Sequence, residues 1–306
     1  MTKRVAIILV NWNGYTHTAN CIDSLLNISY PHFQAIVVDN GSTDHSIPLL
    51  KKHYPNIKII ELGHNHGFTG GNNAAIRYAI DEGFEYTLLL NNDTYVTPSF
   101  LSELVTFIDQ HPHVGAIQPK ILFAHDHTLI WNTGSKFNSW LGYTSVPEYQ
   151  KKDHNNHSVA ETEWITGCAL LMRTSLFKKI GLLSDNMFLY YEDVDLSFRI
   201  KQTGHSLFII PQSVIYHVAG VSGLNNEKSD KPSLKPIIHY YNVRNRIWIL
   251  KKYVAWFKLP TVVIYNTFYI AALLLYFVLK GNPLKMKAVV KGLYDGFTGN
   301  IIPTKA

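Results

Sequence analysis

The sequence predicts an α/β fold in which helices flank a mostly parallel sheet, with a helical, hydrophobic extension at the C-terminus. Short β-branched runs alternate with helical patterns through the first 120 residues, which is the rhythm of consecutive β-α-β units. The chain changes character after residues 223–236, a polar segment with two prolines. It becomes aromatic and basic there, and the 21 residues from Leu259 to Leu279 carry no charge.

Four strands joined by helices are expected in the first part of the chain. Apolar residues at helical spacing predict helices at residues 19–26, at residues 47–54 and from Asn72 onward. Strands joined by such helices run parallel and are covered on both faces, so they are apolar almost throughout. The expected strands are residues 5–11, 35–40, 57–62 and 86–93.

The second part of the chain is irregular as far as residue 164 and regular beyond it. Proline, glycine and histidine interrupt the pattern at residues 118–164. Val194, Phe198 and Ile200 then predict a helix that Gly204 ends. Apolar runs predict further strands at residues 167–173, 206–211 and 213–220.

The composition excludes several classes of protein. The net charge of +6 comes from 28 basic and 22 acidic residues; it suits an acidic ligand or an anionic membrane, but without a Lys/Arg run it predicts no nucleic acid partner. Cys21 and Cys168 lack metal-ligand spacing, so neither a disulfide framework nor a zinc site is expected. The apolar run near the N-terminus is too short for a signal peptide. We therefore expect a protein of the cytoplasm, a reducing compartment.

Each expected strand ends in polar or glycine-containing residues. In open α/β sheets the ligand crevice lies at the carboxyl ends of the strands, so these residues are candidates for ligand binding. The candidates are Asn11, Asn13, Asp39, Asn40, Asp44, Gly70, Gly71, Asn73, Asn92 and Asp93.

Two of these segments allow both a binding and a purely structural interpretation. Asp39 and Asp44 lie in DNGSTD, where a carboxylate can accept hydrogen bonds from a base or ribose. The same residues suit an Asx turn followed by an N-cap. The stretch GFTGGNN matches neither GxGxxG nor a Walker loop, so its glycines allow either a close backbone approach to a ligand or a turn.

Asp93 and His217 are candidate metal ligands. Asp93 follows a buried strand and stands among amides, and its oxygens suit Mg²⁺ or Mn²⁺ with diphosphate oxygens in the remaining positions. A loop aspartate is also a common turn former. A single histidine such as His217 is usually structural, yet beside Asp93 it would complete a mixed nitrogen and oxygen site.

Glu192, Asp193 and Asp195 form an acidic cluster where a helix is expected to start. One member can act as a general base, although acidic residues also favour a helix start through its dipole. In a helix that starts near Tyr191, Glu192 and Asp193 lie about 100° apart, so one of them faces the crevice. Asp195 lies about 200° from Asp193 and is expected to pair with Arg199 at the i+4 spacing.

Seven motifs in order resemble those of the family-2 inverting glycosyltransferases, in particular the rhamnosyltransferase-like branch that also contains galactofuranosyltransferases. The resemblance covers about residues 1–250 and implies a GT-A (Rossmann-like) fold, a nucleotide-diphospho-sugar donor and Mg²⁺ or Mn²⁺ as cofactor. It divides the chain into a catalytic domain at 1–224, with a nucleotide-sugar-binding half at about 1–117 and an acceptor half at 118–224, and an extension at 225–306. The motifs are NWNG, DNGSTDHS, NHGFTGGNN, LLLNNDTYV, TGCALLMRTSLFKKIG, YYEDVDLSFRIKQTGH and YHVAGVSG.

The resemblance also implies roles for individual residues. It selects the second acid of the Glu192–Asp193 pair as the catalytic base. One departure is Asn91, which stands where many relatives carry the first aspartate of the metal-binding motif, so one charge for the metal is missing. The implied roles are base or ribose contact for Asp39, donor-pocket lining for Asn11 and Asn73, metal binding for Asp93 and His217, and general base for Asp193.

The expected reaction is the transfer of a sugar with inversion, from dTDP-rhamnose or a UDP-sugar to a hydroxyl of a saccharide or lipid-linked acceptor. Its place would be cell-surface polysaccharide synthesis. Two other classes remain open. A nucleotidyltransferase shares the sheet and the acidic metal site, but no glycine-rich loop with Arg or Lys follows the first strand. A noncatalytic nucleotide-sugar-binding module would need no base.

The uncharged stretch 259–279 is long enough to span a bilayer, which takes about 20 residues. Pro260 and Asn266 dilute it, and both flanks are basic, so the positive-inside rule gives no direction of crossing. We expect it to lie against the inner face of the cytoplasmic membrane near a lipid-linked acceptor; the alternatives are a buried helix and a homodimer contact. Arg244 and Arg246 precede it and either reach phosphates or are ordinary surface residues.

Overall fold

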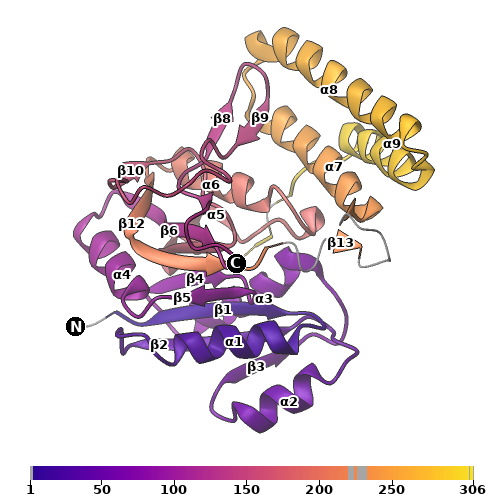
Figure 1. Cartoon of the computed structure of the whole chain (residues 1–306). Coiled ribbons are helices and arrows are strands. Elements are labelled where there is room, and N and C mark those ends of the chain that lie inside the picture. Colours follow the sequence, from indigo (N-terminus) through magenta and orange to yellow (C-terminus); the bar gives the residue numbers. More distant parts are fainter. Residues whose placement is uncertain (1–2, 220–223, 226–232, 303, 306) are drawn as a thin grey trace.

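The computed structural model describes residues 3–219, 224–225, 233–302 and 304–305, and it consists of an α/β body followed by three helices (Figure 1). In the α/β body the strands are β1 (Val5–Asn11), β2 (Phe33–Asp39), β3 (Lys58–Glu61), β4 (Tyr86–Leu90), β5 (Thr94–Val96), β6 (Val114–Phe123), β7 (Ile130–Asn132), β8 (Lys136–Asn138), β9 (Tyr143–Ser145), β10 (Ala160–Glu161), β11 (Ala169–Arg173) and β12 (Ser206–His217). The short strands β13 (Leu224–Asn225) and β14 (Ser233–Leu234) follow. The helices are α1 (Tyr15–Leu25), α2 (Ser46–His53), α3 (Gly67–Asp81), α4 (Phe100–Gln110), α5 (Thr174–Ile180), α6 (Glu192–Gln202), α7 (Pro236–Tyr253), α8 (Leu259–Leu279) and α9 (Pro283–Thr298).

A ten-stranded sheet forms the centre of the described part, with the order β10-β12-β6-β11-β4-β1-β2-β3 and with β5 and β7 attached at its side. β3, β2, β1 and β4 run parallel to one another, and β12 runs parallel to β6. β11 is antiparallel to both of its neighbours, β4 and β6. The predicted mostly parallel sheet is therefore confirmed, with an antiparallel insertion in the middle.

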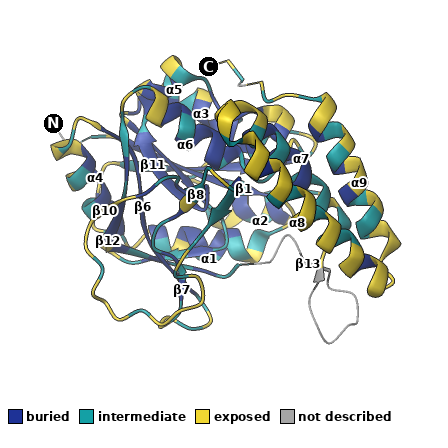
Figure 2. Ribbon diagram, turned by 90° about the horizontal axis from the view of Figure 1, so that it is seen from above, coloured by how far each residue is buried: buried dark blue, intermediate teal, exposed yellow. Residues whose placement is uncertain are grey.

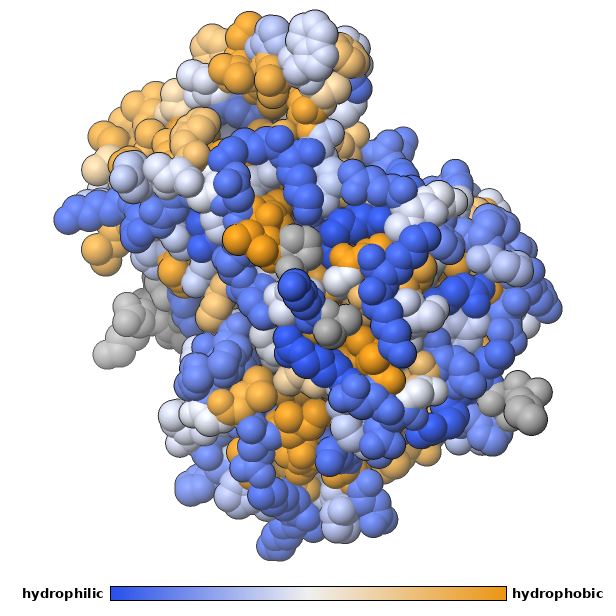
Figure 3. Space-filling model, turned by 180° about the vertical axis from the view of Figure 1, so that it is seen from behind, coloured by the Kyte–Doolittle hydropathy of each residue, from blue (hydrophilic) through white to orange (hydrophobic). Residues whose placement is uncertain are grey.

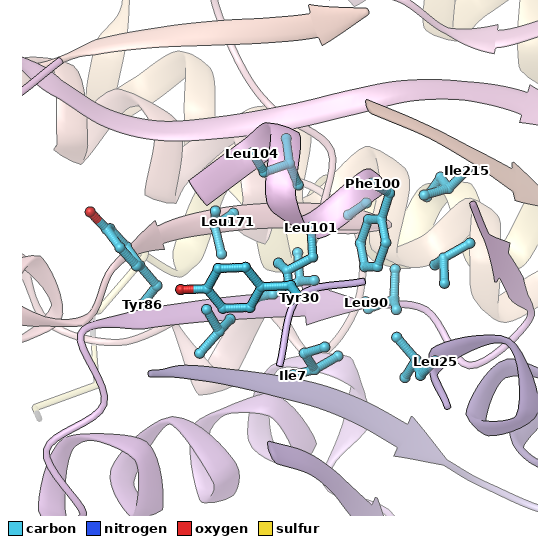
Figure 4. Packing of buried hydrophobic residues seen from close by; sticks show 14 of the residues in the cluster. Ile7, Leu25, Tyr30, Tyr86, Leu90, Phe100, Leu101, Leu104, Leu171 and Ile215 are labelled. Carbon is cyan, nitrogen blue, oxygen red and sulfur yellow. The ribbon is translucent and has the colours of Figure 1, made fainter. Parts of the chain in front are cut away.

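Helices cover both faces of the sheet. Successive residues of a strand point to opposite sides, so an apolar strand presents side chains to the helices on each face. Ile7 and Leu9 of β1 face the cluster that α1 and α4 complete, whereas Ile8 faces the cluster that α3, α5 and α6 complete. Figure 4 shows the first cluster, in which Phe100 and Leu101 of α4 lie against the sheet. This double layer fixes the strands, so the residues at their carboxyl ends have defined positions.

Helix α3 begins earlier than the sequence pattern predicts. It starts at Gly67 rather than at Asn72, so Gly70 and Gly71 lie in its first turns instead of in a loop. A Cβ atom on Gly71 would stand 2.8 Å from Cγ1 of Val10 in β1. Glycine is a poor helix former, so the local pattern hides this start, while the close approach of α3 to β1 requires a glycine.

The sequence pattern also misses β6 and divides β12 into two strands. β12 is continuous from Ser206 to His217, and its register against β6 shifts between Ile210 and Val214. Pro211 lies in that shift, where its missing N–H costs no ladder hydrogen bond. The irregularity suggests a break in the sequence, yet the strand continues to His217.

The predicted C-terminal helical extension is confirmed, and its three helices differ in their surroundings. α7 packs on the α/β body, where Trp248 and Ile249 join Met187 and Val194 in one apolar cluster. α8 projects from the body, and within it Val262 and Phe277 are the buried residues. Most of its other residues are exposed, and the rest are half-buried (Figure 2). Apolar side chains gather over α8 and α9 in Figure 3.

Candidate active site

The carboxyl ends of β1 and β2 form the first part of the site, because their register places Asn11 opposite Asp39. Nδ2 of Asn11 donates to Oδ1 of Asp39 at 2.9 Å and to Oγ of Ser42 at 3.1 Å. The backbone N–H of Ser42 donates to Oδ2 of Asp39 at 2.9 Å. Asn11 and Asp39 are both buried, so together they fix the loop that follows β2.

Asn13 and Asp44 lie at the exposed edge of the same loop. Asn13 has a left-handed backbone, with φ of 51°, and its Oδ1 accepts the backbone N–H groups of Thr43 at 2.8 Å and Asp44 at 3.3 Å. Oδ1 of Asp44 accepts the N–H of Ser46 at 2.9 Å, where α2 begins. The Asx turn considered from the sequence is therefore present, and the exposed carboxylate of Asp44 faces solvent.

Asn40 and Asn73 connect α3 to its surroundings. Nδ2 of Asn40 donates to the carbonyl of Gly67 at 2.9 Å, and its Oδ1 accepts the N–H of His66 at 2.9 Å. The amide of Asn73 bonds both backbone groups of Leu183 and donates to Oδ1 of Asp185 at 2.6 Å. Asn73 therefore ties α3 to the segment that leads into the acidic cluster.

Asp93 and His217 meet at the end of β4. They are 124 residues apart in the chain, yet β5 pairs with β12 and places Thr94 opposite His217. Oδ1 of Asp93 lies 3.1 Å from Nε2 of His217, and Nδ2 of Asn91 lies 3.3 Å from the same nitrogen. Nδ2 of Asn92 donates instead to Oγ1 of Thr18 at 2.8 Å.

Burial and pairing act in opposite directions on the Asp93–His217 pair. Burial raises the pKa of Asp93, but the hydrogen bond and charge of His217 outweigh it and hold the pKa below its usual range. Burial lowers the pKa of His217, while Cys168 and Asp93 raise it, to a net value of about 10. The net shifts favour the charged forms of the pair, and a divalent metal would take the place of a proton on the imidazole.

The donor set of this pair fits Mg²⁺ or Mn²⁺. A carboxylate oxygen suits both ions, whereas an imidazole nitrogen suits the transition metal Mn²⁺ better than Mg²⁺. Both side chains stand at the sheet edge. No group of three or more metal-ligating side chains occurs within the described residues. Asp93 and His217 would then hold two positions, and diphosphate oxygens and water would fill the others.

Glu192 and Asp193 occupy the first turn of α6, close to the end of β4. The backbone N–H of Gly167 donates to Oδ2 of Asp193 at 3.0 Å, and that of Val194 donates to its Oδ1 at 2.8 Å. The next residue, Cys168, accepts the N–H of Asn91 at 2.8 Å through its carbonyl. Residues 167–168 thus connect Asp193 to the strand end that carries Asp93.

The two carboxyl groups of the Glu192–Asp193 pair differ in how well their charge is stabilised. Burial raises the pKa of both, and the charge of Asp193 raises that of Glu192 further. Glu192 is 5% exposed, and its Oε2 has no hydrogen-bond partner in the described part of the chain. Two backbone N–H groups offset the effect of burial on Asp193. Asp193 therefore ionises before Glu192 does.

Asp195 points away from the other two acids, as expected. Its Oδ2 accepts Nε of Arg199 at 2.8 Å, which confirms the predicted i+4 pair. Its Oδ1 accepts Nζ of Lys252 at 2.9 Å and the hydroxyl of Tyr253 at 2.6 Å. Because cations and a hydroxyl hold both oxygens, Asp195 connects α6 to α7 and has a structural role.

The segment before the acidic pair is held by α7, which sequence reasoning missed. Phe188, Tyr190 and Tyr191 have left-handed backbones, with φ of 65°, 69° and 68°, which is rare for bulky residues. Nδ2 of Asn245 donates to three carbonyls of this segment, at Met187, Leu189 and Tyr190, over 3.0, 2.9 and 2.8 Å. A single asparagine thus fixes the strained turn that leads into α6.

Arg244 supports the same segment, so both interpretations considered for it are wrong. It is 9% exposed, and its Nη2 donates to the carbonyls of Asn186 at 2.7 Å and Met187 at 2.8 Å. Its Nε donates to Oδ1 of Asn245 at 2.9 Å. The guanidinium thus donates to backbone carbonyls and is not available to a phosphate. The periodicity of the sequence does not reveal hydrogen bonds of this kind.

The mostly parallel sheet places the chain in the α/β class, and Asp93, His217 and Asp193 lie together at one edge of this sheet as a candidate site. Residues 6–181 match the family model described as glycosyl transferase family 2. This match spans more than half of the 306 residues. The chain therefore belongs to glycosyl transferase family 2.

Individual relatives support this assignment. The chain is 28% identical over 203 residues to a low-salt glycan biosynthesis hexosyltransferase of Haloferax volcanii; the match covers 66% of this chain and 63% of that protein, less than two thirds of the relative. It is 24% identical over 245 residues to an N-acetylglucosaminyl-diphospho-decaprenol L-rhamnosyltransferase of Mycobacterium tuberculosis, covering 73% of this chain and 79% of that protein. The predicted likeness to rhamnosyltransferases is confirmed.

A solved structure confirms the predicted GT-A fold. It is that of a mannosyltransferase from Pyrobaculum calidifontis in complex with GDP-Man and Mn²⁺. The likeness covers 99% of this chain and 77% of that one, with a TM-score of 0.58 and 14% sequence identity. The chain is therefore a glycosyltransferase of family 2 with the fold that the sequence predicted.

Proposed function

We propose that the protein transfers a sugar from a nucleotide-diphospho-sugar to an acceptor hydroxyl, with inversion and with the help of a divalent metal. The observation that carries this proposal is the placement of Asp193 beside the strand end that bears Asp93 and His217, through Gly167 and Cys168. The more readily ionised carboxyl group of the acidic pair thus lies next to a site suited to a metal and a diphosphate. A base and a charge-stabilising site are the two needs of this reaction.

Each group has a defined task in the proposed reaction. Asp193 removes the proton of the acceptor hydroxyl as that oxygen attacks the anomeric carbon from the face opposite the leaving group. Asp93 and His217 would hold Mg²⁺ or Mn²⁺, which neutralises charge on the departing diphosphate. The metal in the mannosyltransferase complex supports this cofactor.

The strand ends and α3 would bind the donor. In this proposal Asp39 and Asp44 contact the base or ribose, and the glycine-containing start of α3 borders the diphosphate. Several of these side chains already bond the surrounding loops, so they also shape the pocket. The proposed donor-binding set is Asn11, Asn13, Asp39, Asn40, Asp44, Gly70, Gly71, Asn73, Asn92 and Asp93.

For the substrates we propose dTDP-rhamnose or a UDP-sugar as donor and a lipid-linked saccharide as acceptor, in cell-surface polysaccharide synthesis. The name of the mycobacterial relative, which combines rhamnosyl transfer with a diphospho-decaprenol acceptor, supports both. A cytoplasmic site at the inner membrane face follows from such an acceptor.

Incubation with nucleotide-sugars and Mn²⁺ tests this function directly. A glycosyltransferase should slowly release nucleoside diphosphate by transferring the sugar to water when no acceptor is present, and chromatography of the nucleotides measures this release. Release of pyrophosphate from a nucleoside triphosphate would identify a nucleotidyltransferase instead. Binding of nucleotide-sugar without any turnover would identify a noncatalytic module.

We propose further that α8 lies against an anionic membrane. Among the described residues, one helical stretch, Trp256–Leu279, is both long enough and apolar enough to cross a bilayer. Trp256, Phe268 and Leu279 are 81%, 73% and 77% exposed, so the helix is no core element of this chain. Basic residues on both flanks favour an orientation along the surface.

The intact protein should therefore float with liposomes that contain anionic lipid. Replacing Val263 and Phe268, both exposed, by serine should reduce the floating fraction, because apolar area drives insertion at the interface. Nucleotide release should be unchanged in this variant. A protein that stays in the soluble fraction with every liposome, and that sediments as a dimer, would show that α8 is a contact between two copies.

A further inference from the structure

Arg246 carries hydrogen-bond donors that nothing in the described chain satisfies. Its Nε and Nη2 are buried and have no partner. The neighbouring Arg244 contrasts with it, since its guanidinium bonds backbone carbonyls. Buried donors without acceptors cost free energy, most of all on a charged group. An acceptor that is absent from the free protein would explain these donors.

The position of Arg246 connects the acidic pair to α8. Its guanidinium carbon lies 4.6 Å from the ring centre of Tyr269 in α8. Tyr191, the residue before Glu192, packs on an apolar cluster that contains Trp248 and Ile249 from the same helix as Arg246. The positive charge of Arg246 opposes the rise that burial causes in the pKa of Tyr191, and the charge of Asp193 adds to that rise. Tyr191 is thus within electrostatic reach of both Arg246 and the proposed base.

The surface next to Arg246 is apolar. Tyr269 is 42% exposed, and Phe268 beside it is 73% exposed. The donor side is different, because the proposed diphosphate site is at Asp93 and His217, on the sheet edge rather than on α7 and α8. A ligand at Arg246 would therefore meet a cation beside an apolar helix, apart from the proposed diphosphate site.

We propose that Arg246 binds the phosphate groups of a polyprenyl-diphosphate-linked acceptor, whose hydrocarbon chain lies along α8 and whose sugar reaches Asp193. This inference rests on the proposed function and names a residue that would bind the acceptor. The planar guanidinium matches the oxygens of a phosphate through paired N–H donors. The apolar face of α8 would take the adjoining hydrocarbon, since both are removed from water together.

Binding of farnesyl diphosphate, a short prenyl diphosphate, tests the proposal with the full chain. Arg246→Gln should weaken this binding by about tenfold or more, the effect of losing charged hydrogen bonds. Arg246→Lys should give an intermediate loss, because it keeps the charge and loses the fork. Arg77→Gln, which removes an exposed arginine from α3, is the matched control and should bind as wild type. Titration calorimetry measures all four proteins.

Four further ligands decide what Arg246 recognises. Farnesol should bind weakly and equally to wild type and Arg246→Gln, and inorganic pyrophosphate should bind much more weakly than farnesyl diphosphate. UDP and dTDP with Mn²⁺ should bind Arg246→Gln as they bind wild type, which also shows that the variant is folded.

Four results would overturn the inference. They are equal binding of farnesyl diphosphate to wild type and Arg246→Gln, equal binding of farnesol and farnesyl diphosphate, pyrophosphate binding as tight as that of farnesyl diphosphate, and a parallel loss of nucleotide binding that would place Arg246 on the donor side. Failure of the proposed function has a separate signature, which is no nucleoside diphosphate release by wild type. In that case Arg246-dependent binding of farnesyl diphosphate would still establish the site.

Discussion

Replacing Asp193 by asparagine should lower turnover by about a hundredfold or more, the range typical of a lost general base. Asparagine keeps the size of the side chain and one acceptor for the N–H groups of Gly167 and Val194, but it cannot take a proton. Donor affinity should stay close to wild type, because Asp193 acts on the acceptor. Steady-state rates and nucleotide titration of the same preparation measure the two quantities.

Glu192→Gln is the matched control for this prediction. Glu192 is the acid of the pair that holds its proton more tightly, so a neutral amide should leave most of the turnover in place. If Glu192→Gln loses activity while Asp193→Asn keeps it, the base is the neighbouring residue.

The pH profile gives a second readout of the same assignment. A base must be ionised, so kcat/KM should fall as the pH falls through the pKa of Asp193. Burial raises that pKa, so the loss should begin at a higher pH than for an exposed aspartate. The acidic limb should be absent from the small residual activity of Asp193→Asn.

Replacing Asp93 by alanine should abolish turnover and weaken donor binding together. The proposed metal stabilises the leaving diphosphate by several kcal/mol, and about 1.4 kcal/mol corresponds to a factor of ten in rate. Without Asp93, His217 is the remaining protein ligand of the proposed site. Rates and nucleotide affinity as a function of Mn²⁺ concentration test this prediction.

Asp81→Ala, which removes an exposed carboxylate at the end of α3, is the control for the change in charge and should behave as wild type. His217→Ala should lose metal affinity as well, with partial recovery at high Mn²⁺. Full activity of the wild-type enzyme in excess chelator would refute the role of the metal.

The sequence predicted those parts of the protein that depend on local pattern. The four parallel strands follow from apolar runs, and the Asp195–Arg199 pair follows from helical spacing. The meeting of Asp93 and His217 was not accessible in this way, because it depends on the pairing of β5 with β12, and the two residues are 124 positions apart in the chain. The resemblance to a family supplied it as an expectation.

Other features left no readable signal in the chain. β6 carries glycine and proline among its apolar residues, so the pattern suggested irregular structure. The bonds from Arg244 and Asn245 go to backbone carbonyls, and a carbonyl is present at every residue whatever its side chain. Such contacts depend on the path of the backbone, which local periodicity does not specify.

The attachment of the turn at residues 187–190 to Asn245 has a consequence for protein engineering. A chimaera that takes its C-terminal helices from a relative must preserve the support of α6. We expect a splice after Tyr253 to leave the native Asn245 in contact with its three carbonyls. A splice before Pro236 would replace Asn245 as well, so the relative's helix would have to carry an asparagine at the same position.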